Sequence, residues 1–286
     1  MTYSAAFYDL KNSLQPLYDE GEAAAIAHAM MEHITGESKL QRLANKDVSF
    51  DTAQEKQYNE VKEQLQRAVP LQYIVGKSWF LNREFAVNSS VLIPRPETEE
   101  LVMWVVSDCR ASNTKPTILD IGTGSGCIAV SLKLELPEST VTACDVSPGA
   151  VLVARANADM LDADISLHAI DFTNVALHDS LGKYDIIASN PPYIPYTEKE
   201  VLHPNVREHE PHVALFVPGD EPLLFYDLIA DFGKTHLSPE GLIYCELDRD
   251  YAVQTKALFE SKGYADVEIR KDMAGNTRML KAMLKK

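Results

Sequence analysis

The chain has 286 residues, of which 45% are hydrophobic and 24% charged, a composition typical of a globular protein with a sizeable core. Its net charge of −15 disfavours binding to the phosphate backbone of a nucleic acid and suits a basic protein or a small cationic ligand. No apolar run has the length of a membrane span and no signal peptide precedes the first helix, so we expect a cytoplasmic protein without a membrane partner.

The first 75 residues are predicted to be helical. The stretch 22–36 has apolar side chains at four-residue steps, and a glycine follows them: Ile26, Met30, Ile34, then Gly36. The stretch from Asp51 to Pro70 has a second apolar face: Tyr58, Val61, Leu65 and Ala68. We expect these faces to pack on each other, so that residues 1–75 form a small helical domain.

Residues 76–95 are predicted to link this domain to a second one. Between Trp79 and Ile93, short apolar stretches are broken by asparagine and serine, a pattern that favours a hairpin. Pro96 then suits the first turn of a helix over 97–109, because a proline at that position loses no intrahelical hydrogen bond. We assign residues 96–286 to the second domain.

Beyond Pro116, predicted strands alternate with predicted helices. The strands are 117–122, 140–145, 165–172, 184–190, 241–247, 265–271 and 277–284. The helices are 126–135, 148–160, 223–232 and 252–262. Strands separated by helices imply right-handed crossovers, so the expected fold class is α/β, with a doubly wound, mostly parallel seven-stranded sheet.

A glycine-rich loop joins the first of these strands to its helix. It consists of Gly122, Thr123, Gly124, Ser125 and Gly126. Such a loop lets the backbone turn tightly and approach a ligand, although some glycine-rich turns serve packing alone. The G-x-G-x-G spacing differs from the G-x-G-x-x-G of dinucleotide-binding proteins.

Acidic residues follow the next two predicted strands. Asp145 ends the second strand, where a carboxylate can accept hydrogen bonds from ribose hydroxyls. Asp171 and Phe172 end the third, where they could contact a nucleobase, although ordinary core packing explains Phe172 equally well. With the glycine loop, these residues indicate a ligand that contains a nucleoside but no pyrophosphate, and S-adenosylmethionine fits that description.

The segment SNPPYI (189–194) follows the fourth predicted strand. Two prolines must end the strand, because proline donates no N–H to a sheet and restricts the residue before it. A rigid turn is the alternative explanation, but the neighbouring glycine loop favours a functional one.

At this point the sequence resembles the class I S-adenosylmethionine-dependent methyltransferases and, more narrowly, the release factor N5-glutamine methyltransferases of the HemK family. Six segments carry the resemblance over nearly the whole chain: PLQYIVG (70–76), VLIPRPETEEL (91–101), LDIGTGSGCIAV (119–130), SNPPYI (189–194), EHEPHVALF (208–216) and DMAGNTRMLKA (272–282). NPPY alone is shared with adenine N6 methyltransferases of DNA. The resemblance implies a monomeric enzyme whose substrate is a peptide chain release factor, recognised with the help of residues 1–75.

The resemblance also implies roles for single residues. Those that would contact the cofactor are Gly122 to Gly126, Asp145, Asp171, Phe172 and Asn190. Those that would hold the target glutamine amide are Asn190, Pro191, Pro192 and Tyr193. An amide nitrogen is a poor nucleophile, and it attacks a methyl group better when acceptors hold its two N–H groups. The Asn190 side-chain oxygen and the Pro191 carbonyl would be these acceptors, and the Tyr193 ring would lie over the amide.

Two stretches depart from the family pattern. Asp248 stands where the family more often has a glycine, which puts the turn after the fifth strand in doubt. The sequence Gly219-Asp220-Glu221-Pro222 replaces a more usual glycine-rich form, so the loop after Phe216 is uncertain.

Other functions were weighed against this one. A metal site among His203, His209 and His212 would need helical or hairpin spacing, whereas these residues occupy a proline-bearing loop. The cysteines are scattered and include no C-x-x-C pair: Cys109, Cys127, Cys144 and Cys245. We therefore expect no metal. Adenine methylation in nucleic acid is disfavoured by the acidic charge. Methylation of a glutamine in a ribosomal protein, or a non-catalytic binding module of the same fold, remain as alternatives.

Overall fold

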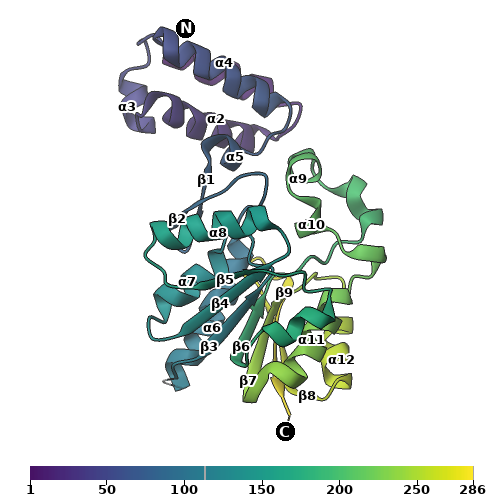
Figure 1. The fold of residues 1–286 in the computed structure, drawn as a ribbon. Helices are drawn as coiled ribbons and strands as arrows, with labels where there is room; N and C mark the ends of the chain where they lie inside the picture. The colour runs from purple at the N-terminus through teal and green to yellow at the C-terminus, as the bar shows by residue number, and fades with distance from the viewer. Residues whose placement is uncertain (113, 286) are drawn as a thin grey trace. The chain divides into compact units, whose positions relative to one another are not determined.

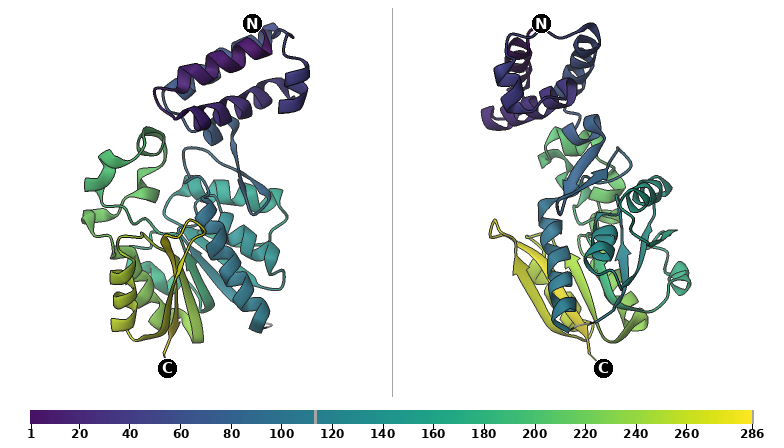
Figure 2. Two further views of the ribbon diagram at one scale, coloured as in Figure 1. Left: turned by 180° about the vertical axis from the view of Figure 1, so that it is seen from behind. Right: turned by 90° about the vertical axis from the view of Figure 1, so that its left-hand side faces the viewer.

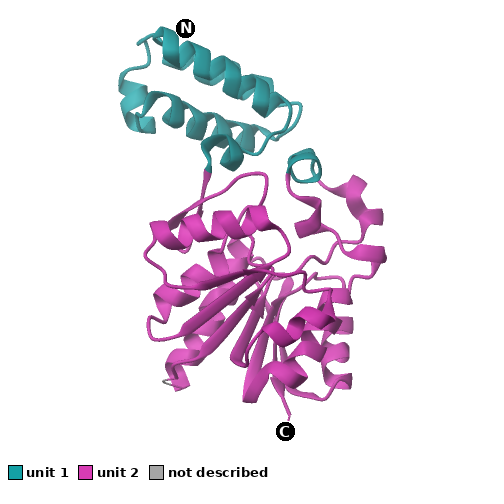
Figure 3. Ribbon diagram, in the orientation of Figure 1, with its two compact units in different colours: residues 1–76, 203–209 teal, residues 77–202, 210–286 magenta. Residues whose placement is uncertain are grey.

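The computed structural model describes residues 1–112 and 114–285. The chain forms two compact units, shown in Figure 3. Unit 1 contains residues 1–76 together with residues 203–209, and unit 2 contains residues 77–202 and 210–286. In the described part of the chain, no helix combines the length and the apolar character needed to cross a membrane.

Unit 1 is a helical bundle. Its helices are α1 (Tyr3–Leu14), α2 (Glu20–Thr35), α3 (Lys39–Ala44), α4 (Thr52–Gln66), α5 (Leu71–Val75) and, from the segment 203–209, α9 (Pro204–His209). Side-chain oxygens cap the starts of four of them, since Thr2, Asp19, Ser38 and Asp51 each accept a hydrogen bond from a backbone N–H in the first turn. Fully buried Leu10, Met30 and Leu65 belong to the bundle core.

The second predicted helix of this bundle ends earlier than expected. The prediction that Ala68 lies on the apolar face of that helix is wrong: α4 ends at Gln66, and Ala68 occupies a turn with φ of 60°. Pro70 explains the early end, because a proline disfavours helical conformation in the residue before it. The Ala68 side chain is nevertheless buried.

Unit 2 is a seven-stranded sheet covered by helices, as predicted (Figure 1). Its strands are β3 (Thr117–Ile121), β4 (Thr140–Asp145), β5 (Ser166–Ala169), β6 (Tyr184–Ser189), β7 (Leu237–Glu246), β8 (Tyr264–Lys271) and β9 (Thr277–Leu284). Their order in the sheet is β5-β4-β3-β6-β7-β9-β8, and only β9 runs antiparallel to its neighbours. A separate hairpin of β1 (Lys77–Phe80) and β2 (Arg83–Ala86) precedes this sheet.

Helices cover both faces of the sheet (Figure 2). They are α6 (Pro96–Ser112), α7 (Cys127–Glu135), α8 (Pro148–Met160), α11 (Leu224–His236) and α12 (Ala252–Ser261). The short helix α10 (His212–Leu215) and 3-10 turns at Val175–Ser180, Tyr196–Val201 and Pro218–Asp220 lie in the connections between strands. Alternate strand residues enter separate cores: Ile118 packs with residues of α6 and α7, whereas Leu119 packs with residues of α11 and α12. β3 is therefore buried on both faces and apolar at Ile118, Leu119 and Ile121, with Asp120 as its buried polar residue.

Two predicted strands differ from the structure by more than one residue at an end. The third was expected to run to Phe172, but β5 ends at Ala169, so Asp171 and Phe172 lie in the turn that follows. The fifth was expected to begin at Gly241, but β7 begins at Leu237 and its pairing with β6 shifts register between Tyr184 and Ile186. The irregular start of β7 conceals the strand in the sequence, because Ser238, Pro239 and Gly241 are typical of turns.

Candidate active site

A cavity of ≈ 280 Å³ lies where the carboxyl ends of the parallel strands meet. Its lining includes eight of the predicted site residues: Gly122, Gly124, Asp145, Asp171, Phe172, Asn190, Pro191 and Pro192. These residues follow four different strands, β3 to β6. The order β4-β3-β6 places the reversal of strand order at β3, which is where an open α/β sheet binds its ligand.

The glycine loop needs its glycines for conformation and for space. Gly122, Gly124 and Gly126 have φ of 74°, 53° and 80°, in the left-handed region that side chains rarely adopt. A Cβ on Gly126 would also lie 3.2 Å from the Cα of Ala154 in α8. The loop side chains Thr123 and Ser125 are buried and do not line the cavity, so Gly122 and Gly124 are its exposed backbone surface.

Asp120, in β3 just before the glycine loop, is hydrogen-bonded to the loop and to the helix after it. One carboxylate oxygen, Oδ2, accepts hydrogen bonds from the Thr123 hydroxyl at 2.6 Å and from the Ala129 N–H at 3.2 Å. The other, Oδ1, is buried without a hydrogen-bond partner among the described residues, and burial raises the pKa of Asp120 to about 7. Asp120 was not among the predicted site residues, although an acidic residue in an apolar strand just before a glycine loop was a usable signal.

Asp145 connects the second strand to the same loop. Its Oδ2 accepts a hydrogen bond from the Gly124 N–H at 2.9 Å, and its Oδ1 accepts one from the Ser147 N–H at 2.9 Å. Burial raises the pKa of this carboxyl, and the backbone N–H groups oppose that effect. Each carboxylate oxygen can accept more than one hydrogen bond, so Asp145 can still accept from a ligand in the cavity.

Asp171 and Phe172 lie at the cavity in different ways. The Asp171 side chain accepts hydrogen bonds from the N–H and the hydroxyl of Thr173. The Phe172 ring stacks on His178, with centroids 4.4 Å apart, and packs edge-on against Phe232. Phe172 is 5% exposed and belongs to a hydrophobic core, so core packing accounts for most of its surface although it also lines the cavity.

The NPPY segment leaves the sheet at the end of β6. Ser189, the last strand residue, donates its hydroxyl to the Ile121 carbonyl at 2.7 Å. Asn190 follows, and its Nδ2 donates to the Thr98 hydroxyl oxygen at 3.2 Å. Tyr193 is not among the residues that line the cavity; its hydroxyl lies 3.5 Å from Glu246 Oε1.

A short parallel bridge holds the chain after Tyr193. The Ile194 N–H donates to the Leu215 carbonyl at 3.1 Å, and the Val217 N–H donates to the Ile194 carbonyl at 2.9 Å. This bridge brings Phe216 and Pro218 to the cavity wall. The divergent turn Gly219-Asp220 adopts positive φ at both residues and lies beside that wall rather than in it.

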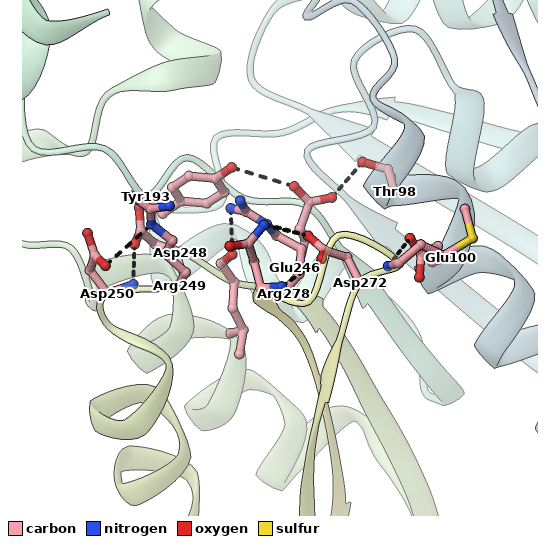
Figure 4. Close-up of polar contacts among 12 residues, drawn as sticks. Thr98, Glu100, Tyr193, Glu246, Asp248, Arg249, Asp250, Asp272 and Arg278 are labelled. Atoms are coloured by element: carbon pink, nitrogen blue, oxygen red, sulfur yellow. Dashed lines mark hydrogen bonds and ion pairs between the residues drawn. The ribbon is translucent and has the colours of Figure 1, made fainter.

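Asn190 is hydrogen-bonded through Thr98 to a set of residues that we call the buried polar cluster: Thr98, Tyr193, Glu246, Asp272 and Arg278 (Figure 4). Thr98, Glu246 and Asp272 are buried, and Tyr193 and Arg278 are partly buried. Glu246 ends β7 and is 2% exposed. The Thr98 hydroxyl donates to Glu246 Oε2 at 2.5 Å, and Arg278 Nε lies 3.7 Å from Asp272 Oδ2. Burial raises the pKa of Glu246 to about 7. The cluster could not be predicted from the sequence, because its members are far apart in the chain.

The turn after Glu246, where Asp248 departs from the family pattern, is closed locally. Asp248 Oδ1 accepts a hydrogen bond from the Asp250 N–H at 2.7 Å. The turn therefore forms without a glycine, and Asp248 does not line the cavity.

The histidines considered for a metal site have other partners. In unit 1, His203 Nε2 contacts the Leu17 carbonyl at 3.0 Å and His209 Nε2 contacts the Arg67 carbonyl at 2.8 Å. His212 packs against the rings of Tyr196 and Phe216. Over residues 1–112 and 114–285, no group of three or more His, Cys, Asp or Glu side chains is arranged to hold a metal ion.

Solved structures share the fold of unit 2 at low sequence identity. The hMettl16 catalytic domain, solved in complex with a 3'UTR hairpin, has a TM-score of 0.55 at 20% identity, covering 70% of this chain and 74% of that chain. The T. thermophilus 16S rRNA methyltransferase RsmC, solved with AdoMet and guanosine, has a TM-score of 0.50 at 17% identity, covering 73% of this chain and 50% of that chain. These similarities show the methyltransferase fold.

Sequence relatives define the family. The family model "Methyltransferase small domain" matches residues 104–208, and "PrmC N-terminal domain" matches residues 10–76. The release factor glutamine methyltransferase of Flavobacterium psychrophilum is 39% identical, covering 94% of each chain, and that of Bacteroides thetaiotaomicron is 38% identical, covering 96% of this chain and 97% of that protein. That of Bacillus subtilis is 35% identical, covering 98% of each. The chain therefore belongs to the release factor glutamine methyltransferase family.

Proposed function

We propose that this enzyme transfers a methyl group from S-adenosylmethionine to the side-chain nitrogen N5 of a glutamine in peptide chain release factors, the glutamine of their GGQ motif. The observation that carries the proposal is that the glycine loop and Asp145 line the same cavity as Asn190 and Pro191. A binding site for a nucleoside and a pair of amide acceptors are thereby adjacent, as transfer of a methyl group to an amide requires.

The cavity has the chemistry that S-adenosylmethionine needs. Asp145 can accept from the ribose hydroxyls, and the exposed backbone of Gly122 and Gly124 allows the ligand to approach closely. Asp171 and the edge of Phe172 are available to the base. The negative charge of the carboxylates favours a cationic ligand. When bound, S-adenosylmethionine supplies an electrophilic methyl group.

Asn190, Pro191 and Tyr193 act on the glutamine. The Asn190 side-chain oxygen and the Pro191 carbonyl accept hydrogen bonds from the two N–H groups of the target amide, which directs the nitrogen lone pair away from conjugation with its carbonyl. Pro192 keeps the Pro191 carbonyl in place because its ring restricts the backbone. Tyr193 does not line the cavity, so the contact of its ring with the amide stays a prediction from the family resemblance. No strong general base is required, because an N-methylated amide cation loses its proton readily.

Unit 1 is proposed to recognise the release factor. The residues of the cavity all belong to unit 2, whereas the bundle has a core of its own. Deletion of residues 1–75 should leave S-adenosylmethionine affinity within about threefold but reduce methylation of the folded release factor by at least tenfold. A short glutamine peptide is the control substrate, since both forms should methylate it equally. If the truncated form methylated the folded release factor at the full rate, unit 1 would have no role in its recognition.

The four cysteines are free and buried, which agrees with a reducing compartment, and we propose that the enzyme acts in the cytoplasm. We also propose that it acts as a monomer, which light scattering after size exclusion would test.

Mass spectrometry tests the activity directly. The enzyme and S-adenosylmethionine are incubated with a release factor or with ribosomal proteins, and digested peptides are searched for a glutamine heavier by one methyl group. Modification of the GGQ glutamine in the release factor is expected, and the Asn190→Ala variant is the control. Modification confined to a ribosomal protein would assign the alternative substrate, and no modification of either would contradict the proposal.

A further inference from the structure

We propose that Glu246, acting through Thr98, sets the orientation of the Asn190 side-chain amide, so that its oxygen rather than its NH2 group faces the glutamine. Both are positioning residues, because neither lines the cavity. The inference deepens the proposed function, and its kinetic test rests on that function.

The orientation of Asn190 needs an explanation, because its oxygen and nitrogen have nearly the same size and packing does not distinguish them. Only the oxygen can accept a hydrogen bond from the target amide. If the Asn190 side-chain amide were turned by 180°, its NH2 group would face the two N–H groups of the target amide, and no hydrogen bond could form between them. Catalysis therefore requires a partner on the far side of Asn190 that accepts but does not donate.

Counting protons identifies that partner. An ionised Glu246 carboxylate has no proton to give, so the hydrogen bond of 2.5 Å to Thr98 uses the one hydroxyl proton of Thr98. Toward Asn190, the Thr98 oxygen can then only accept, and Asn190 must present Nδ2, which lies 3.2 Å away. The chain Glu246–Thr98–Asn190 thus has one direction, and the Asn190 oxygen is the atom left for the cavity.

The direction depends on the charge of Glu246. If its carboxyl is protonated, Glu246 can donate to Thr98, Thr98 can donate to the Asn190 oxygen, and the chain reverses. The polar and charged groups that face the Glu246 carboxyl come from several elements: Thr98 and Glu97 of α6, Cys127 of α7, Arg278 of β9, Arg95 and Tyr193. The Tyr226 hydroxyl donates to the backbone carbonyl of Glu246. Arg278 and Arg95 favour the ionised form, whereas burial and Glu97 favour the protonated form, and the resulting pKa of about 7 leaves the carboxyl titratable near neutral pH.

Two threonine variants and one glutamate variant test the chain. Thr98→Val keeps the shape but removes the hydroxyl, whereas Thr98→Ser keeps the hydroxyl. We expect Thr98→Val to lower kcat by about tenfold, the value of one hydrogen bond, with KM for the release factor and affinity for S-adenosylmethionine nearly unchanged. Thr98→Ser should recover most of that loss. Equal kcat in the two variants would overturn the proposal.

The pH profile gives a readout that a merely structural role would not change. Wild-type kcat should fall as the pH drops below about 7, the pKa of Glu246, because the protonated carboxyl permits the reversed chain. Glu246→Gln cannot ionise, so its profile should lack this limb. The same substrate serves both proteins, so its own titration cancels. An unchanged acid limb in Glu246→Gln would contradict the proposal, and this variant decides the matter if Thr98→Val does not fold.

A second readout needs no substrate and so separates this inference from the proposed function. The side-chain NH2 signals of Asn190 in ¹⁵N-labelled full-length protein are assigned by their loss in Asn190→Ala. One of the two protons should show the downfield shift of a hydrogen bond in wild type and Thr98→Ser at pH 8, but not in Thr98→Val. Identical signals in Thr98→Val and wild type would overturn the inference, whatever the substrate of the enzyme proves to be.

Discussion

The glycine loop and the buried polar cluster contribute to the same cavity but are built differently. At the glycine loop, the Asp145 carboxylate accepts from the Gly124 N–H, and the Asp120 carboxylate accepts from the Thr123 hydroxyl and the Ala129 N–H, over separations of 3 to 21 residues. In the buried polar cluster, side chains hold side chains, and the hydrogen bond between Thr98 and Glu246 spans 148 residues. Each region also contains one fully buried carboxyl whose pKa is about 7.

This difference predicts different sensitivities. Replacing a carboxylate that holds the glycine loop should weaken the affinity for the cofactor. The rate of methyl transfer at saturating cofactor should change little. A chain of side-chain hydrogen bonds that ends on Asn190 should affect the rate of methyl transfer and leave cofactor affinity nearly unchanged. Three measurements test this contrast, beginning with the largest expected effect.

Replacing Asn190 should affect the rate most. Asn190→Ala removes the acceptor that the Thr98 hydroxyl orients and leaves one target N–H without a partner, so kcat should fall by roughly 10²–10³-fold. Asn190→Asp keeps an oxygen but adds a charge that is costly to bury, so its kcat should lie between alanine and wild type. Single-turnover transfer at saturating cofactor measures this, with melting temperatures as the folding control. A loss of under threefold would mean that NPPY is a structural turn here.

Replacing Asp145 should affect the cofactor instead. Asp145→Ala removes the acceptor for the Gly124 N–H and for the ribose, so S-adenosylmethionine affinity should weaken by about 1.5–3 kcal/mol. Asp145→Asn, which keeps one acceptor oxygen, should lose less. Titration calorimetry measures both. If Asp145→Ala bound S-adenosylmethionine as tightly as wild type, Asp145 would be a support for the loop and not a ligand-binding residue.

The two buried carboxyls should also make stability depend on pH. Burial raises the pKa of Asp120 and Glu246 above their values in the unfolded chain, so the folded protein binds these protons more tightly. The stability they contribute is complete at low pH and is lost as the pH rises through about 7. Between pH 5 and pH 8, each should lower the free energy of unfolding by about 1–3 kcal/mol.

Urea denaturation at a series of pH values measures this dependence. Asp120→Asn and Glu246→Gln should each remove about half of the decline, and the double variant most of it. If the single variants kept the wild-type pH dependence, the carboxyls would not titrate in this range, and the pH argument for Glu246 would fail with it.

Sequence predicted the parts of the fold that depend on continuous patterns. The strands 117–121 and 140–145 have buried apolar side chains at Ile118, Leu119, Ile121, Val141, Ala143 and Cys144, which make them recognisable in the sequence, and Pro96 marks the start of α6. Within the predicted helical region, α3 was not located as a separate element because it has six residues, too few for a periodic pattern. The short helices between residues 196 and 220 were missed for the same reason, and because prolines interrupt them.

The residues of the candidate site also fall into a group that the sequence predicts and a group that it does not. Gly122, Asp145 and Asn190 could be found because each stands at the end of an apolar strand, and strand ends of a parallel sheet meet. Thr98 and Glu246 could not, because a threonine in a helix and a glutamate at a strand end are ordinary until the fold brings them within 2.5 Å. Sequence also gave no sign that His203 and His209 belong to the bundle.

That last feature affects how the protein is made. The bundle is the first part of the chain to be synthesised, yet the contact of Leu17 with His203 spans 186 residues. At about 5–20 residues per second, a ribosome needs roughly 6–25 seconds to add the residues between 76 and 203. The nascent bundle therefore exists for that time without its last helix, α9. Its final packing must wait until the NPPY segment has been translated, so completion of the bundle is coupled to synthesis of the catalytic unit.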